Sequence, residues 1–367
     1  MKILILGGTG AMGIHLTHIL SQRNDSIYIT SRQNLTSFGN VHYLLGNAHN
    51  LTFIKQILAS SWDAIIDFMI YSTEEFKERY DLFLNATPQY VFLSSARVYA
   101  NDTSPITDKS ARLLDTCQDT FFLQTDEYSL RKAREENLLL YSGKKNYTII
   151  RPYITYSEIR LQLGIYEKEK WLYRALHGRT IVFSSDIAQH ITTLSYGYDV
   201  AFCLAELIGN PSAIGETYTI TSSESIRWKD VLNIYLSEIE KLTGRKPKVK
   251  FIEEPLEYKI PSSKYVIKYD RRFDRCFNNT KITSICNDFV FTKTDDGLRK
   301  CIADFIAHPS FHPINFLYEA KHDRITHEIT SLKEIAGFKP KVSYLLCRFT
   351  PYFEIKNFIK TKFFHGK

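Results

Sequence analysis

The first thirteen residues contain the feature that most limits how this chain can fold. A short apolar run, Lys2 to Leu6, passes directly into a turn in which Gly7, Gly10 and Gly13 stand three residues apart. Glycines at a turn from a strand into a helix let the backbone approach a phosphate group closely, and the helix N-terminus attracts the anion. The chain is therefore expected to begin with a βαβ unit that has an anion site at its first turn.

Apolar runs of four or five residues recur through the first half, with helical stretches between them. Their β-branched and aromatic residues favour strands, and the alternation is typical of a parallel sheet covered by helices. We predict a doubly wound α/β fold whose ligand lies at the carboxyl ends of the strands. The predicted strands are Lys2–Leu6, Ser26–Thr30, Val41–Leu45, Ala64–Phe68, Tyr90–Leu93 and Tyr147–Ile150.

The second half has a mixed pattern. We expect helices over Glu167–His177, Val200–Ile208 and Trp228–Thr243, and a further strand over Glu216–Ile220. No linker of low complexity separates the halves. The two parts are therefore expected to interleave.

Composition excludes several classes of protein. The net charge of +7 is mild for 367 residues, and no nucleic-acid partner is expected from it. The six cysteines lack the paired spacing of a zinc site and the eleven histidines lack HExxH spacing, so no metal is expected. Because no run of about 18 apolar residues occurs, we predict a soluble, cytoplasmic protein with reduced thiols.

A tyrosine and a lysine stand four residues apart in TDEYSLRKAREENLLL. In a helix, Tyr128 and Lys132 would share one face, where the ammonium favours the phenolate form and so suits the tyrosine to proton transfer. Such pairs also occur by chance on surface helices. Ser95, just after the fifth predicted strand, has a hydroxyl suited to holding a substrate oxygen, although strand-end serines commonly bond to their own backbone.

These segments together resemble the extended branch of the short-chain dehydrogenase/reductase family, the NAD-dependent epimerases and dehydratases. The resemblance rests on the glycine spacing, Tyr128-x-x-x-Lys132, YVFLSSARVYA, IIRPYITY, YGYDVAFCLAEL and GETYTITSSESIRWKDVL, and it covers roughly residues 1–306. It implies a Rossmann-like dinucleotide-binding domain over residues 1–155, to which 185–208 returns. A smaller, interleaved α/β substrate-binding part over 156–330 and a basic, aromatic C-terminal extension over 331–367 complete the expected organisation.

The resemblance also implies the roles of individual residues in hydride transfer with a nicotinamide. Ser95, Tyr128 and Lys132 would be catalytic. The cofactor-binding residues would be Gly7, Thr9, Gly10, Ala11, Met12, Gly13, Ser31, Arg32, Asn47, Phe68, Met69, Tyr128 and Lys132. The substrate-binding residues would be Ser95, Arg97, Arg271, Arg272 and Arg275.

The last three of these arginines lie in YDRRFDRCFNNTKI and suit a diphosphate because the guanidinium binds two oxygens at once. A solvated charged loop is the alternative. At the end of the second predicted strand, Thr30, Ser31 and Arg32 provide no acid for an adenine ribose. Arg32 suits a 2′-phosphate, so NADP(H) is favoured, with NAD(H) as the alternative.

Three departures from the family narrow the reaction. The 32 residues between Ser95 and Tyr128 are more than usual and are expected to form a loop over the substrate. Ala96 and Arg97 stand where sugar 4,6-dehydratases have acids, and Ile154 stands where an asparagine often contacts the nucleotide-sugar. We expect NADPH-dependent reduction of a 4-keto nucleotide-sugar. An epimerase that retains NAD(P), and a non-catalytic NAD(P)- or RNA-binding member of the fold, are the alternatives.

The expected partners are a nucleotide-sugar and a second copy of the chain in a homodimer. The tail from Val342 alternates aromatic and basic residues. Three placements stay open for it: peripheral contact with an anionic membrane, packing on a subunit, or cover for the protein's own core.

Overall fold

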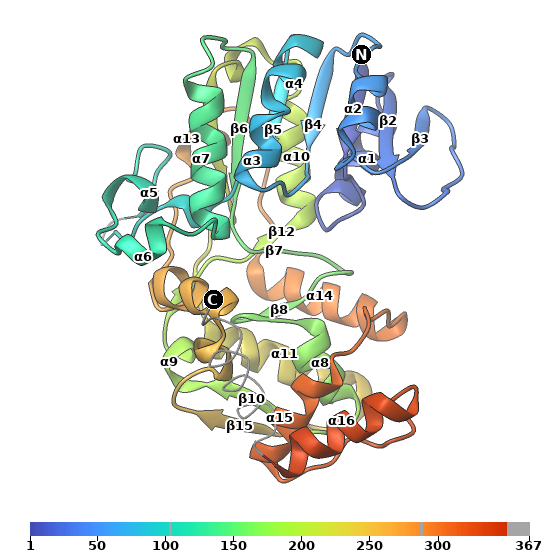
Figure 1. Cartoon of the computed structure of the whole chain (residues 1–367), viewed down its shortest axis with the longest axis vertical. Coiled ribbons are helices and arrows are strands. Elements are labelled where there is room, and N and C mark those ends of the chain that lie inside the picture. Colours follow the sequence, from blue (N-terminus) through green and yellow to red (C-terminus); the bar gives the residue numbers. More distant parts are fainter. Residues whose placement is uncertain (103–104, 287–288, 351–367) are drawn as a thin grey trace, which may run out of the picture.

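A computed structural model of the chain describes residues 1–102, 105–286 and 289–350 (Figure 1). The upper part in Figure 1 is built on a parallel seven-stranded sheet with the order β13-β6-β5-β4-β1-β2-β3. This confirms the predicted doubly wound sheet. Its strands are β1 (Lys2–Leu6), β2 (Ser26–Ser31), β3 (Val41–Leu45), β4 (Ala64–Asp67), β5 (Tyr90–Leu93), β6 (Tyr147–Pro152) and β13 (Glu216–Ile220).

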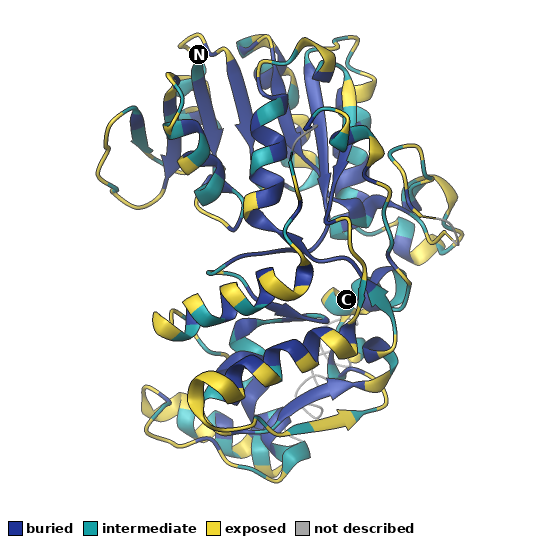
Figure 2. Ribbon diagram, turned by 180° about the vertical axis from the view of Figure 1, so that it is seen from behind, coloured by how far each residue is buried: buried dark blue, intermediate teal, exposed yellow. Residues whose placement is uncertain are grey.

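Alternate side chains of each strand supply the two faces of this sheet. In β1, Ile3 and Ile5 pack against one helical layer and Leu4 and Leu6 against the other, and all four are fully buried. Figure 2 shows the central strands of the sheet buried, the edge strand β3 partly exposed, and the flanking helices exposed on their outer sides. One layer contains α1 (Gly13–Ser21) and α10 (Gly197–Leu207); the other contains α2 (Leu51–Ile57), α3 (Thr73–Lys77), α4 (Tyr80–Ala86) and α7 (Tyr128–Leu140).

The chain crosses between the sheet and the lower part more than once. After β6, β7 (Thr155–Tyr156) pairs with β12 (Ser195–Tyr196), and α10 then packs on α1. β13 follows and pairs with β6 as the edge strand of the sheet. Elements within 156–330 therefore contribute to the half that contains the glycine turn.

The lower part encloses its own apolar core. Trp171 and Tyr235 stack there with ring centroids 4.5 Å apart, and Trp228 packs beside them. Its elements are α8 (Lys168–Leu176), β10 (Ile181–Ser184), α9 (Ser185–Ala188), α11 (Trp228–Thr243), β15 (Val249–Ile252), α12 (Pro261–Val266) and α14 (Thr294–Ala307), and the short pairs β8 (Gln162–Leu163) with β9 (Tyr166–Glu167) and β11 (Ile191–Thr192) with β14 (Ile226–Arg227).

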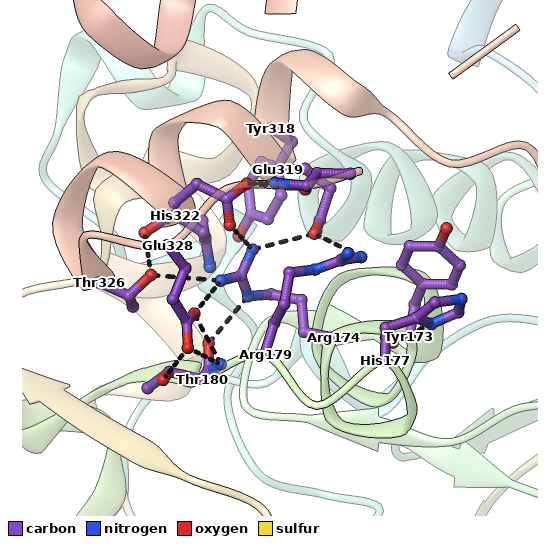
Figure 3. Close-up of polar contacts among 12 residues, drawn as sticks. Tyr173, Arg174, His177, Arg179, Thr180, Tyr318, Glu319, His322, Thr326 and Glu328 are labelled. Atoms are coloured by element: carbon purple, nitrogen blue, oxygen red, sulfur yellow. Dashed lines mark hydrogen bonds and ion pairs between the residues drawn. The ribbon is translucent and has the colours of Figure 1, made fainter. Parts of the chain in front are cut away.

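A C-terminal helical hairpin, α15 (Phe316–Thr326) and α16 (Phe338–Phe349), docks on α8 through a buried ionic cluster (Figure 3). Arg174 of α8 is fully buried, and its guanidinium lies 2.9 Å from both Glu319 and Asp323 and 3.2 Å from Glu328. It also donates to the Thr180 carbonyl at 2.9 Å. The hairpin is therefore joined to the lower part by charge as well as by packing.

This hairpin accounts for the first part of the C-terminal tail. Tyr344 and Cys347 of α16 are fully buried against α15, so from Val342 to Thr350 the tail covers the protein's own core. The proposed contacts with a membrane or a subunit fall mainly on residues 351–367, which lie outside the described residues.

Candidate active site

The glycines of the first turn have separate structural reasons. Gly7 adopts a φ of 74°, which L side chains rarely adopt. A Cβ on Gly13 would lie 2.4 Å from the Gly8 carbonyl oxygen, so only glycine lets α1 pack this closely on the turn. At Gly10 a Cβ would meet nothing within 4 Å, because that side of the turn is open. The open side leaves room for a ligand against the backbone.

The N-terminus of α1 is available to that ligand. Met12 occupies the N-cap position and its side chain makes no capping hydrogen bond. Amide groups in the first turn of a helix lack partners inside the helix and favour an anion. At the start of the glycine turn, before the helix, the Gly7 amide donates to the Thr30 hydroxyl at 3.1 Å. This hydrogen bond ties the turn to β2. The turn is therefore rigid and its helix end is uncapped.

Ser95, Tyr128 and Lys132 line one cavity of about 420 Å³ at the carboxyl ends of β4, β5 and β6. Ser95 caps a short 3₁₀ helix, where its hydroxyl accepts from the Arg97 amide at 3.2 Å. Tyr128 is the first residue of α7 and Lys132 lies one turn later. Met12, Phe68 and Met69 border the same cavity. The structure thus brings together the three predicted catalytic residues and part of the predicted cofactor site.

Arg97 lies directly against the tyrosine. Its guanidinium carbon is 5.2 Å from the Tyr128 ring centroid, and the group pairs with Glu127 at 2.6 Å. A cation over the face of an aromatic ring is attracted by the negative potential of that face. Arg97 also lines the cavity, where it is available to a substrate.

Only one of the three clustered arginines lines this cavity. Arg271 does so, donating to the Gly164 carbonyl at 3.0 Å and pairing with Asp270, and burial lowers its pKa to about 10. Arg272 is bound by Asp186 and Glu254, both at 2.8 Å. The prediction of a substrate contact does not fit Arg272, because two carboxylates of the lower part occupy its guanidinium.

Arg275 also lies away from the cavity. It is fully buried and donates to the carbonyls of Ala100, Tyr99 and Tyr269 at 2.9, 3.3 and 2.8 Å. Its Nε lies 3.2 Å from Asp270. A buried guanidinium needs partners for its donors, and here backbone carbonyls accept from both terminal nitrogens while Nε faces the Asp270 carboxylate. The predicted substrate role of Arg275 is therefore replaced by a structural one.

The predicted adenine-side residues lie at the ends of β2 and β3. The Ser31 hydroxyl exchanges hydrogen bonds with its own loop at Gln33, while Arg32 is exposed. Asn47 is exposed too, and its side chain accepts from the His49 amide at 3.0 Å. Thr9, Gly10 and Ala11 border a second cavity of about 470 Å³ that faces the lower part.

Sequence reasoning missed Arg160. This side chain borders both cavities, and its guanidinium pairs with Glu167 at 2.7 Å. It thus stands between the glycine turn and the predicted catalytic pair. The neighbouring Ile154 also lines the site with a φ of 29°, which is rare for a β-branched residue. The segment RPYITY gives no local sign of the backbone conformation of Ile154, and the following SEIRLQ gives none of the position of Arg160.

A buried carboxylate that sequence reasoning also missed, Glu136, holds α7 against β5 and β6. It is fully buried, accepts from the Ser94 hydroxyl at 2.5 Å and pairs with Arg151 at 2.6 Å and Arg112 at 3.1 Å. Ser94 and Arg151 belong to the ends of the two strands that border the cavity. The network therefore sets where Ser95 stands relative to α7.

Apart from Arg97 near its start, the described part of the long segment between Ser95 and Tyr128 does not line the cavity. None of its described residues from Ala100 to Asp126 lines it. Phe122 instead stacks between Tyr265 and Tyr269, with ring centroids 4.7 and 4.5 Å away. We expected this segment to form a loop over the substrate. The aromatic contacts explain why it does not, because they hold the segment against Tyr265 and Tyr269 of the lower part.

Two kinds of feature are missing from the described residues. No group of three or more His, Cys, Asp or Glu side chains is arranged to hold a metal ion. No helix in the described ranges has the length and apolar character needed to cross a bilayer.

Known proteins share the fold of this chain. The chain has the fold of the extended short-chain dehydrogenases/reductases, which include nucleotide-sugar epimerases and dehydratases. No family model matches the chain. The chain is therefore compared with individual proteins, which show the similarity.

Two solved structures illustrate it. The UDP-glucuronic acid 4-epimerase from Bacillus cereus, in complex with UDP-glucuronic acid and NAD, has a TM-score of 0.63 and 15% identity over 84% of this chain and all of its own. The dTDP-glucose 4,6-dehydratase from Bacillus anthracis, in complex with NAD, has a TM-score of 0.63 and 16% identity, over 84% of this chain and 97% of its own. Identities this low establish a shared fold only.

A curated protein from Arabidopsis thaliana is similar in sequence. The chloroplast stem-loop binding protein of 41 kDa b is 24% identical over 307 residues, which cover 74% of this chain and 76% of that protein.

Proposed function

We propose that this protein is an NADP(H)-dependent oxidoreductase that reduces the 4-keto group of a nucleotide-linked sugar. The observation that carries the proposal is the single cavity shared by Ser95, Tyr128 and Lys132 with Met12 of the glycine turn and Met69 after β4. In this cavity the Tyr128 hydroxyl, suited to proton donation, lies with a residue of a glycine turn that suits an anion. Hydride chemistry with a dinucleotide needs both.

The residues present fit a dinucleotide. The open side of Gly10 and the uncapped end of α1 suit its pyrophosphate. Arg32 and Asn47 would hold its adenine half, and Met69 would border its nicotinamide. A bound nicotinamide would supply the hydride. The chain's own residues supply the remaining chemistry.

Proton transfer is assigned to Tyr128. Its hydroxyl donates a proton to the carbonyl oxygen of the substrate while the Ser95 hydroxyl holds the same oxygen. Arg97 lies over the Tyr128 ring, and Lys132 borders the same cavity one helical turn further along α7. Arg271 and Arg160 line the cavity and suit the diphosphate of the substrate.

The test is a panel of UDP-, dTDP- and GDP-linked sugars, with and without a 4-keto group, mixed with the purified protein and NADPH or NADH. A reductase consumes the reduced cofactor in proportion to product. An epimerase, the form that the NAD-bound solved structures favour, converts sugar without net consumption. If no nucleotide-sugar is converted and no dinucleotide binds, the proposal is wrong.

Arg32 is proposed to set the cofactor preference. Hydrogen bonds to a charged group contribute roughly 1.5–3 kcal/mol, so Arg32→Ala is expected to weaken NADPH about 10- to 150-fold. The lower end is expected because Arg32 is exposed and solvent screens it. The affinity for NADH should hardly change. Dissociation constants for both cofactors are compared at one ionic strength, with Arg32→Lys to separate charge from geometry. Equal losses for both cofactors, or a wild type that prefers NADH, would contradict the assignment.

Binding to an RNA stem-loop is a second candidate function, favoured by the curated relative. The described surface offers one matching feature. Arg245, Lys246 and Lys248 are exposed around a hollow of about 450 Å³ between the ends of α8 and α11. No hydrogen bond or ion pair among the described residues uses these three side chains. Unpaired cations on one face suit the phosphates of a nucleic acid.

Replacing these three residues together with alanine is expected to weaken binding to an RNA hairpin at least tenfold, with a shallower dependence on salt, because each phosphate contact releases counterions. Gel-shift titrations at several salt concentrations measure both quantities. Exposed Lys229, Lys259 and Lys333 provide a control triple variant of equal charge. Equal weakening in both triple variants would indicate a general charge effect, and no RNA binding by the wild type would remove this candidate.

A further inference from the structure

The ammonium of Lys132 is held inside the protein by a second residue of its own helix. Its Nζ lies 3.0 Å from Glu135 Oε2, and the exposed fractions of the two side chains are 1% and 0%. The Met69 carbonyl is 3.5 Å away and the Phe92 ring centroid 4.4 Å away. Lys132 therefore borders the cavity, and its positive charge is paired with the buried carboxylate of Glu135.

Glu135 has little other support. Among the described residues neither of its carboxylate oxygens has a hydrogen-bond partner, so the ion pair with Lys132 is its main compensation. Burying a carboxylate in this way is costly unless a charge opposes it. The carboxylate is consequently sensitive to any change in nearby charge.

A second buried carboxylate shares the same ammonium. Asp67 at the end of β4 is fully buried and accepts from the Met69 amide at 2.9 Å and the Tyr90 hydroxyl at 2.8 Å. The titratable groups around Glu135 are Lys132 and Arg131 on α7, Asp67 on β4, Tyr71 after β4 and Tyr90 on β5. The charge of Lys132 thus acts on two buried carboxylates, and Phe68 and Met69, the two residues that follow Asp67, border the cavity.

Burial raises the pKa of Glu135 to about 7 and the pKa of Asp67 to about 6, although Lys132 acts in the opposite direction on both. Ionising both carboxyl groups would leave a net negative charge in the interior. The charge behind the cavity therefore becomes more negative as the pH rises through neutrality.

We propose that Glu135 is a positioning residue that holds Lys132 and sets the negative charge behind the nicotinamide site, and that it thereby favours the oxidised over the reduced cofactor. This inference rests on the proposed nicotinamide binding. The physical reason is that the oxidised ring carries a positive charge and the reduced ring does not. Glu135 therefore changes the ratio of the affinities for the oxidised and reduced cofactors, and its role involves no contact with the sugar.

The test measures dissociation constants of NADP⁺, NADPH, NAD⁺ and NADH for the full-length protein. In wild type, the preference for the oxidised form should rise as the pH passes through about 7, because Glu135 then ionises. Glu135→Gln should lose this rise and bind the oxidised forms about fivefold to tenfold more weakly at higher pH, with little change for the reduced forms. Below about pH 6 the variant and wild type should agree.

Glu135→Asp is the control, because it keeps the charge and should retain the pH dependence. If Glu135→Gln does not fold, the wild-type pH series alone still decides, since a ratio that is constant across neutrality overturns the proposal. Unchanged ratios in a folded Glu135→Gln variant also overturn it while leaving the proposed function intact. No binding of any of the four dinucleotides to wild type would overturn both.

Discussion

Tyr128→Phe is expected to lower turnover of the nucleotide-sugar by about 10²- to 10⁴-fold, the usual contribution of a general acid. Only the phenol oxygen is lost, so the ring still packs beneath the Arg97 guanidinium, 5.2 Å away. Folding and dinucleotide affinity should be nearly unchanged. Single-turnover rates with the active substrate, together with dissociation constants for NADPH, provide the measurement.

Tyr141→Phe is the matched control for this variant. Tyr141 follows the end of the same helix and is 80% exposed, away from the cavity. Removing the Tyr141 hydroxyl should leave turnover unchanged. Near-normal turnover in Tyr128→Phe would remove this residue from the mechanism, and a loss of NADPH affinity to match the loss of rate would indicate a binding role instead.

Arg174→Met is expected to destabilise the protein by roughly 3–5 kcal/mol, the usual loss when one partner of a buried ion pair is removed. Glu319 and Asp323 would then be buried without their common cation, since both lie 2.9 Å from it. The C-terminal hairpin should detach first. Urea unfolding, with limited proteolysis near α15, measures the loss.

The pH dependence of this loss separates charge from packing. Burial already raises the pKa of Glu319 to about 7, and without Arg174 this pKa should rise further, so the loss should be largest above neutrality and decline as the pH falls through about 7. A deficit in unfolding free energy that is the same at all pH values would mean that packing alone was lost. Arg23→Met is the control, because its pair with Glu206 is about one-third exposed and should contribute under about 1 kcal/mol.

Local pattern was enough to predict the strands of the sheet. Lys2–Leu6, Val41–Leu45, Tyr90–Leu93 and Glu216–Ile220 have the predicted bounds, because short runs of β-branched and aromatic residues favour strands wherever they are buried. The position of Glu216–Ile220 beside β6 was not predictable in this way. Strand propensity does not specify the neighbouring strand, which depends on how the chain returns from the lower part.

The arginines show the same limit for the candidate site. Arg271, Arg272 and Arg275 are alike in sequence, yet only Arg271 lines the cavity. Arg275 is turned inward by the Ala100 carbonyl, which is 175 residues away along the chain. No local pattern encodes a partner at that separation. Arg160 and Glu136 were missed for the same reason.

The sequence by itself determined the glycine turn, the order of strands and helices in the first half, and the one-turn spacing that puts Tyr128 and Lys132 on the same face of α7. These depend on neighbouring residues, through backbone freedom, propensity and helical period. Tertiary structure alone decided that the Lys132–Glu135 pair is buried, that Arg275 binds backbone carbonyls and that Arg174 holds the C-terminal hairpin. Burial decides these cases, because a charge removed from water must find its partner wherever the fold places one.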